Sequence, residues 1–197
     1  RPGNAVEGTE EGTILPKLLP AERLAAYRST WLLTSRETLA LRGASLAGSL
    51  AQSLEKARPA FEAAMAELRA QEPILRTWEE GLAAGRTFRF TEGLEEKKAM
   101  AQRLLVCLKA LPAVELPYYR LGELQSLRDS GIAVGGAPRP GAPNLDQALG
   151  LFAAARPKLD TAMGELFRAL SLFSRVASDS PLGEFFGDRG SGALGGG

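Results

Sequence analysis

Apolar side chains recur along most of this chain at steps of three, four and seven residues, the spacing that places them on one face of an α-helix. The pattern predicts an all-α protein, an up-and-down bundle of about four main helices and one additional short helix. The expected helices span residues 21–57, 59–84, 94–111, 117–130 and 145–178. Packing of their apolar faces would form a single domain over residues 21–180.

Proline and glycine mark the expected helix ends. Pro59 is expected to begin or bend a helix, because proline has no backbone N–H to donate. Pro73 should kink or divide the second helix, and Gly85 should end it. Pro112 should close the third helix, and Pro117 should open the short fourth one.

Residues 132–143 (IAVGGAPRPGAP) show no helical period and predict a long connection. Asn144, with Gln147 three residues later, has the spacing of a capping box, which predicts the start of the last helix. The connection also contains a PxxP sequence, from Pro140 to Pro143 beside an arginine. SH3-type domains read such sequences, so recognition by one of them is an alternative for this segment.

A stripe of small residues follows one face of the first predicted helix. It consists of Ala40, Gly43, Ala44, Ala47, Gly48 and Ala51. Small side chains let another segment approach closely, and the glycines favour a bend near Gly43. We interpret the stripe as intramolecular packing, with a partner-binding groove as the alternative.

One segment of the chain occurs twice. Residues 57–68 (ARPAFEAAMAEL) and 155–166 (ARPKLDTAMGEL) are identical at seven of twelve positions. Internal duplication and convergence of helix-forming residues are both open as explanations. Either explanation predicts that the apolar positions of both copies lie in the core. These positions include Phe61, Met65, Leu159 and Met163.

The two ends of the chain differ in composition from the predicted bundle. Residues 1–20 predict an extended N-terminal arm, and residues 181–197 predict an irregular Gly-rich tail. Apolar side chains in the arm, in the connection at 85–93 and in the tail are candidates for contact with a partner. These candidates are Ile14, Leu15, Leu18, Leu19, Phe88, Phe90, Phe185 and Phe186.

The residues that most enzymes use are missing. The chain has no histidine, which excludes Ser-His-Asp and Cys-His catalysis and removes the commonest metal ligand. The one cysteine, Cys107, lies in an apolar run, and we interpret it as a core residue. Paired acids such as Glu79 and Glu80 are adjacent and do not face each other on a helix. We expect no enzyme activity, no cofactor and no metal site, with catalysis by carboxylates alone as the weakest alternative.

Charge and hydropathy limit the expected partners. The chain carries 24 basic and 23 acidic residues, a net charge of +1, whereas a general nucleic-acid binder needs a basic surplus. No apolar run approaches the roughly 18 to 20 residues needed to cross a bilayer, so no transmembrane segment is expected. Peripheral association with a membrane stays open, because Trp31 and several arginines share the first predicted helix.

A helical body without reactive groups predicts a non-catalytic structural or scaffold subunit that packs onto other protein subunits. The layout, an extended arm before an Ala-rich bundle, is similar to that of the lumenal extrinsic proteins of photosystem II, such as the PsbQ group. This resemblance implies an extrinsic subunit of an organellar membrane complex. The absence of an initiator Met indicates a processed mature form or a trimmed fragment. We favour a processed chain, in a plastid lumen, a mitochondrion or a secreted compartment. The alternative is a free-standing module that binds a peptide or lipid in a groove along the first two helices.

Overall fold

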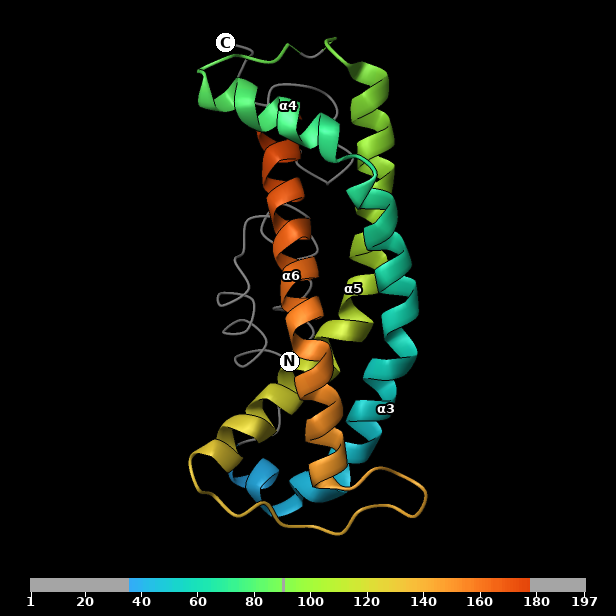
Figure 1. Cartoon of the computed structure of the whole chain (residues 1–197), viewed down its shortest axis with the longest axis vertical. Coiled ribbons are helices and arrows are strands. Elements are labelled where there is room, and N and C mark those ends of the chain that lie inside the picture. Colours follow the sequence, from blue (N-terminus) through green and yellow to red (C-terminus); the bar gives the residue numbers. More distant parts are fainter. Residues whose placement is uncertain (1–35, 90, 178–197) are drawn as a thin grey trace, which may run out of the picture. The chain divides into compact units, whose positions relative to one another are not determined.

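The computed structural model describes residues 36–89 and 91–177 of the chain (Figure 1). These residues form α3 (Arg36–Arg69), α4 (Glu72–Ala83), α5 (Leu94–Asp129) and α6 (Leu145–Ala177). Within the two described ranges there is no strand, and the predicted all-α bundle fold is confirmed. The predicted arm (1–20), the predicted tail (181–197) and the first part of the first predicted helix lie outside the described residues.

The described residues group into two compact units, and α3, α5 and α6 each contribute to both. Unit 1 contains residues 64–89, 91–108 and 163–177. Unit 2 contains residues 36–63 and 109–162. The single-domain organisation stays a prediction.

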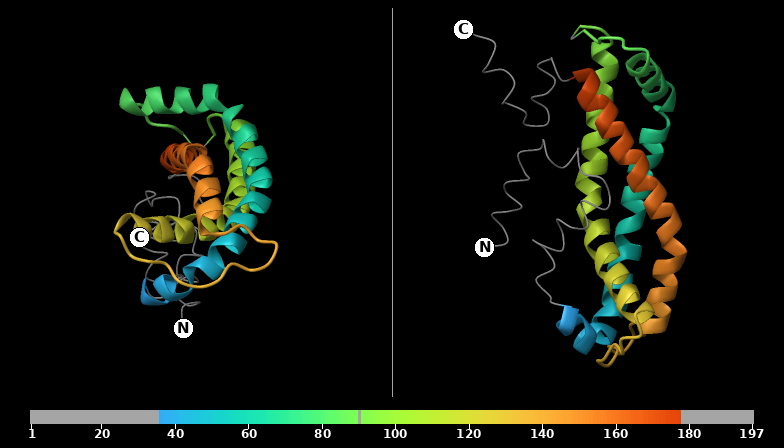
Figure 2. Two further views of the ribbon diagram at one scale, coloured as in Figure 1. Left: turned by 60° about the horizontal axis from the view of Figure 1, so that its bottom comes forward. Right: turned by 90° about the vertical axis from the view of Figure 1, so that its left-hand side faces the viewer.

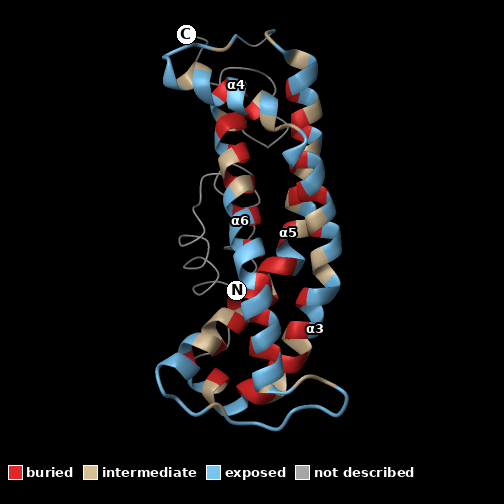
Figure 3. Ribbon diagram, viewed as in Figure 1, coloured by how far each residue is buried: buried red, intermediate tan, exposed pale blue. Residues whose placement is uncertain are grey.

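The core of unit 1 joins α4 to segments of the three longer helices. Trp78 of α4 packs against Phe173 of α6, with ring centroids 6.2 Å apart and planes tilted by 53°. Buried and exposed positions alternate along each long helix (Figure 3), as amphipathic helices require. Other buried side chains of unit 1 are Met65, Leu68, Leu75, Met100, Leu104, Cys107, Met163, Leu166 and Leu170.

The core of unit 2 combines apolar packing with a part-buried polar contact at its edge. Tyr118 of α5 packs edge-on against Phe152 of α6 at 5.4 Å between ring centroids. The Tyr118 hydroxyl donates to the carboxylate of Asp160, an exposed residue of α6, so the polar end of this buried tyrosine has a partner. Other buried side chains of unit 2 are Leu39, Leu54, Phe61, Leu111, Val114, Leu121, Leu124, Leu149 and Leu159.

Prolines interrupt fewer helices than the sequence predicts. α3 continues through Pro59 and α6 through Pro157, so the predicted helix boundary at residues 57–59 is wrong. Each proline removes one backbone hydrogen bond. Phe61 and Leu159, two residues after each proline, are 0% and 1% exposed, and burial of such side chains is comparable in free energy with the cost of the proline.

The same correction applies to α5. The sequence predicts separate helices over 94–111 and 117–130, but α5 is one helix that contains both Pro112 and Pro117. Val114, between the two prolines, is fully buried, and buried side chains continue on both sides. Tertiary packing on one continuous face therefore outweighs the two missing backbone donors.

Two other predicted boundaries are confirmed. α3 ends at Arg69 and α4 begins at Glu72, with Pro73 in the first turn, where a missing N–H costs no hydrogen bond. α4 ends before Gly85, whose φ of +77° suits a residue without a side chain. The Gly85 N–H donates to the Leu82 carbonyl at 3.1 Å and closes the helix end.

The two copies of the repeated segment share a local ion pair as well as core positions. Arg58 lies 2.9 Å from Glu62, and Arg156 lies 3.7 Å from Asp160, in each case four residues apart across a proline. The apolar positions predicted to be buried are at most 1% exposed. They are Phe61, Met65, Leu159 and Met163.

Candidate interaction surface

Residues 132–143 fold onto the first turns of α3 within unit 2, and we call them the strap. The Gly135 N–H donates to the Ala40 carbonyl at 2.6 Å, and the Gly135 carbonyl accepts from the Ala44 N–H at 2.9 Å. In an uninterrupted α-helix these two groups of α3 would pair with each other. We call this pair of hydrogen bonds the Gly135 clamp. Figure 2 shows the first turns of α3, in blue, running in a different direction from the rest of the helix, as expected for a bend near Gly43.

Two glycines of α3 make room for the strap. A Cβ on Gly43 would lie 2.4 Å from Leu124 and 2.6 Å from Val134. A Cβ on Gly48 would lie 2.4 Å from the carbonyl oxygen of Pro143. The small-residue stripe is therefore an intramolecular packing surface, as predicted, and the strap occupies the space beside its glycines.

Helix caps fix both ends of the strap. At the end of α5, the Ile132 N–H donates to the Leu127 carbonyl at 3.0 Å and Gly131 has a φ of +75°, as in a Schellman motif. At the start of α6, the Gln147 N–H donates to the Asn144 side chain at 2.8 Å. The Gln147 side chain in turn accepts from the Asn144 N–H at 3.0 Å, which confirms the predicted capping box.

The PxxP sequence of the strap is folded into a turn. The Ala142 N–H donates to the Arg139 carbonyl at 3.0 Å, and Gly141 has a φ of +79°. Proline followed by a glycine of positive φ is the arrangement of a type II turn. A ligand of an SH3-type domain is a polyproline II helix, which has no internal hydrogen bonds. Pro140 to Pro143 is therefore not in the conformation that such domains bind, and that alternative is wrong for the clamped strap.

A hollow of about 660 Å³ opens at the C-terminal end of the strap. Its lining carries no charged side chain and combines small, amide and apolar groups. The lining residues are Gln52, Gly141, Ala142, Pro143, Gln147, Gly150 and Leu151. Only Gln52 comes from α3, so the hollow differs from the apolar groove that the sequence predicts along the first two helices.

Large apolar side chains are exposed mainly in unit 2. Among the described residues, four are at least 36% exposed: Leu41 at 72%, Val106 at 56%, Leu151 at 41% and Ile132 at 36%. Of these, only Val106 lies in unit 1. Leu41 follows Ala40 of the Gly135 clamp, Ile132 begins the strap, and Leu151 lines the hollow. Unit 2 therefore presents exposed apolar side chains on backbone that hydrogen bonds hold in place.

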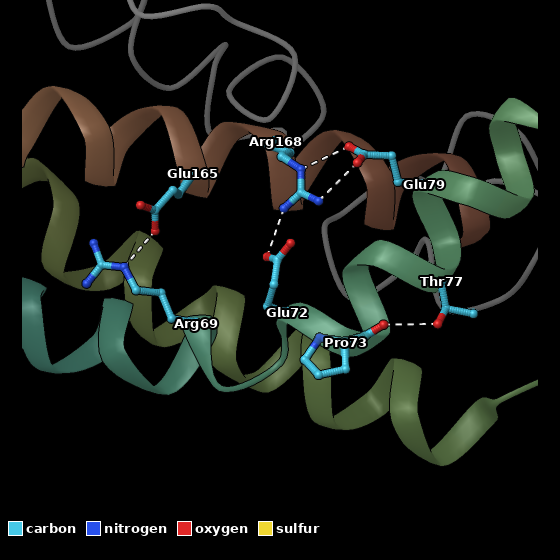
Figure 4. Close-up of polar contacts among 7 residues, drawn as sticks. All are labelled: Arg69, Glu72, Pro73, Thr77, Glu79, Glu165 and Arg168. Atoms are coloured by element: carbon cyan, nitrogen blue, oxygen red, sulfur yellow. Dashed lines mark hydrogen bonds and ion pairs between the residues drawn. The ribbon is translucent and has the colours of Figure 1, made fainter.

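The main ionic cluster of unit 1 connects α4 to α6 (Figure 4). Arg168 donates to Glu72 at 2.9 Å and to both carboxylate oxygens of Glu79 at 2.9 and 3.2 Å. Nearby, Arg69 of α3 donates to Glu165 of α6 at 2.7 Å. These pairs fasten helices to one another, and Arg168 is already engaged by two carboxylates.

The electrostatic effects within this cluster are reciprocal. Hydrogen bonds from Arg168 hold the pKa of Glu79 below its ordinary value. The hydrogen bonds to Glu79 and Glu72 raise the pKa of Arg168. Both effects favour the charged forms, so the cluster is a closed ion-pair network, which gives it a structural role.

Cys107, Tyr118 and Lys97 also have shifted pKa values, and all three side chains are buried. Burial raises the pKa of Cys107 to about 11, which keeps the thiol protonated at neutral pH and fits the predicted core role. Burial and the neighbouring Asp160 raise the pKa of Tyr118. Burial lowers the pKa of Lys97, whose Nζ donates to the Arg89 carbonyl at 3.0 Å. None of these three side chains lines the hollow.

The predicted partner-contact residues are mostly not described by the structure. Phe88 is half-buried, and it packs against α4 at a point where a Cβ on Gly81 would lie 2.8 Å from its ring. The Arg86 guanidinium lies over the Phe88 ring, 4.7 Å from the ring centroid. The remaining candidates lie outside the described residues. They are Ile14, Leu15, Leu18, Leu19, Phe90, Phe185 and Phe186.

Within residues 36–89 and 91–177, no group of acidic, histidine or cysteine side chains is arranged to hold a metal ion. No helix in this part of the chain combines the length and the apolar character needed to cross a bilayer. Comparison of the sequence and structure with known proteins finds no matching family, no matching curated protein and no matching solved structure.

Sequence reasoning missed the Gly135 clamp and the Arg168 cluster. The clamp has a signal in the sequence: the connection contains the pair Gly135 and Gly136, and α3 contains Gly43 and Gly48. Close approach of two glycine-containing segments is a common use of glycine, but periodicity does not reveal which segments meet. The Arg168 cluster depends on tertiary packing of α4 against α6, which the sequence pattern leaves undetermined.

Proposed function

We propose that this chain is a non-catalytic helical subunit that docks onto other proteins through the strap side of unit 2. The observation that carries the proposal is the exposure of Leu41, Ile132 and Leu151 on a backbone fixed by the strap and its helix caps. Exposed apolar side chains, one of which (Leu151) lines a hollow, suit a protein contact, since their burial is favourable and a fixed backbone loses little entropy.

The ionisable groups support a structural role. Arg168 and Glu79 are committed to each other, and Cys107 is buried with a raised pKa. The uncharged lining of the hollow also gives no counter-charge for a phosphate or a carboxylate substrate. The finer expectation, an extrinsic subunit of an organellar membrane complex such as a photosystem, is part of this proposal and rests on the layout of the sequence.

The hollow favours a second candidate function, which is binding of an uncharged peptide segment. Gln52 offers an amide beside the apolar edge of Leu151, and Gly150 leaves open space on the α6 face. An amide next to an apolar surface can pair with peptide backbone while side chains pack on the leucine. This candidate places the ligand at the C-terminal end of the strap rather than along the first two helices.

Substitution of exposed leucines tests the proposed function. We expect Leu41→Glu and Leu151→Glu to weaken co-purification with the native assembly, because a charge would be buried against the partner. Size-exclusion chromatography with light scattering of material from the natural source measures this association. Val106→Glu is the matched control, since Val106 is also exposed but lies in unit 1.

Two outcomes would contradict the proposal. One is a native chain that elutes as a single free chain with no associated protein. The other is equal loss of association in all three variants, which would show that the strap side of unit 2 has no special part in docking.

A further inference from the structure

We infer that the strap is a latch with two states. In the clamped state, Gly135 pairs with the Ala40 carbonyl and the Ala44 N–H of α3. In the released state, the strap leaves α3, and Ala40 and Ala44 pair with each other. This inference concerns unit 2 alone and does not depend on the proposed function.

The two states exchange equivalent hydrogen bonds. Gly135 engages one donor and one acceptor of α3, and these two groups are partners in a regular helix. On release, the Ala40 carbonyl and the Ala44 N–H hydrogen-bond to each other. Only the N–H and the carbonyl of Gly135 then need water as their hydrogen-bond partner. A backbone group of α3 is therefore never left buried without a partner, which removes the main barrier to such an exchange.

Release of the strap is local. The Schellman motif at Gly131 and the capping box at Asn144 hold the two ends of the strap without help from α3. Arg128 of α5 and Asp146 of α6 form an ion pair at 2.5 Å that connects the same two helix ends. The strap can leave α3 while α5 and α6 stay folded.

The clamped strap covers part of the α3 surface. It lies against Gly43 and Gly48, and its Val134 side chain approaches Gly43 beside the fully buried Leu124. Release would expose the α3 surface at Gly43 and Gly48, together with the Val134 side chain of the strap. The latch thus controls access to a surface of α3 that a second chain segment with small residues could occupy.

Amide hydrogen exchange of the unmodified protein tests the latch. If the Ala44 N–H donates to the Ala40 carbonyl after release, the Gly135 amide becomes open to solvent while the Ala44 amide is protected by Ala40. We expect the Gly135 amide to exchange at least about tenfold faster than the Ala44 amide after correction for intrinsic rates. Equal protection of the two amides would mean that they open together in ordinary local unfolding, and that result would overturn the inference.

A glycine substitution provides the second test. A Cβ on Gly48 would collide with the Pro143 carbonyl, so Gly48→Ala favours the released state. We expect exchange of the Gly135 amide to accelerate about tenfold while exchange of the Ala44 amide changes little. Gly150→Ala, in open space on α6, is the matched control and should not accelerate exchange of either amide.

The variant can also contradict the latch. Faster exchange of both amides by the same factor, or an unchanged rate for both, would show that Ala40 and Ala44 do not pair when the strap moves. If Gly48→Ala fails to fold, the comparison of the two amides in the unmodified protein decides the question alone.

Discussion

Glycines at helical positions of this chain fall into two groups with opposite consequences for substitution. A Cβ built on Gly150 or Gly164 of α6 would meet no atom within 4 Å beyond the nearby helix backbone, whereas one on Gly48 of α3 would lie 2.4 Å from the Pro143 carbonyl oxygen. A helix gains about 1 kcal/mol when an exposed internal glycine is replaced by alanine. The sequence alone does not separate the two groups, because the separation depends on where the strap lies.

We predict that Gly150→Ala and Gly164→Ala each raise the free energy of unfolding by up to about 1 kcal/mol. Gly48→Ala should lower the stability of the clamped form, because the same helix-forming gain is opposed by a backbone collision. Urea unfolding monitored by circular dichroism gives the three values. A gain from Gly48→Ala equal to that of Gly150→Ala would contradict the contact between the strap and α3.

Leucine and phenylalanine side chains also differ by position. Phe61, in the first copy of the repeat, is 0% exposed, and Leu41 is 72% exposed. We predict that Phe61→Ala lowers the free energy of unfolding by about 3–5 kcal/mol, since it leaves a cavity as well as losing burial. Leu41→Ala, the control, should change it by less than about 0.5 kcal/mol. Chemical denaturation measures both, and a small effect at Phe61 would argue against its place in the core.

At the scale of helices and their connections, the capping box is the clearest case of a local rule that holds. Asn144 and Gln147 exchange two hydrogen bonds at the start of α6. Asn144→Ala should lower the free energy of unfolding by about 1 kcal/mol, because an N–H of the first turn loses its partner. Asn144→Ser retains a capping oxygen and should preserve most of the stability. Equal loss in both variants, measured by thermal unfolding, would show that the cap is not the source of the effect.

The ion pair between Glu79 of α4 and Arg168 of α6 gives a prediction for the pH dependence of stability. The pKa of Glu79 is lowered in the folded state, chiefly by hydrogen bonds from Arg168, from an ordinary value of 4.5. Its stabilising contribution is therefore complete above pH 4.5 and is lost as the pH falls through the lower folded pKa. We predict that Glu79→Gln loses less stability than the unmodified protein between pH 7 and pH 3, as measured by urea midpoints.

The control for the pH prediction is Glu67→Gln, which changes an exposed carboxylate of α3. Its loss of stability on acidification should match that of the unmodified protein. Identical pH profiles for Glu79→Gln and the unmodified protein would show that the ion pair with Arg168 adds nothing measurable, as happens for many exposed pairs.

Helix continuity shows where sequence reasoning failed and why. The rule that proline divides a helix holds at Pro73, which α4 accommodates in its first turn, but fails at Pro59, Pro112, Pro117 and Pro157. Local propensity describes one missing hydrogen bond at each site. It does not count the buried side chains on both sides of the proline, which belong to one continuous face. Periodicity predicted those faces correctly, so the core residues were more predictable than the helix ends.

For the whole molecule, the all-α class follows from hydrophobic periodicity, but the candidate surface does not. The strap was predicted as a connection because residues 132–143 lack a period. Its seat on α3 depends on non-local hydrogen bonds of Gly135 with Ala40 and Ala44, about ninety residues earlier in the chain. Leu41 lies two residues after the buried Leu39, off the apolar face that the helical spacing predicts, so its exposure agrees with the periodicity. The periodicity does not show that the strap lies beside it on α3.

The most direct test of the account is hydroxyl-radical footprinting of the native assembly, compared with the isolated chain. Radicals oxidise leucine, isoleucine and valine according to their exposure, so each exposed apolar side chain reports on its own surface. Docking through the strap side predicts that Leu41, Ile132 and Leu151 of unit 2 are protected severalfold in the assembly, while Val106 of unit 1 is oxidised equally in both samples. Unchanged oxidation of the three unit 2 side chains in the assembly would contradict docking through the strap side of unit 2.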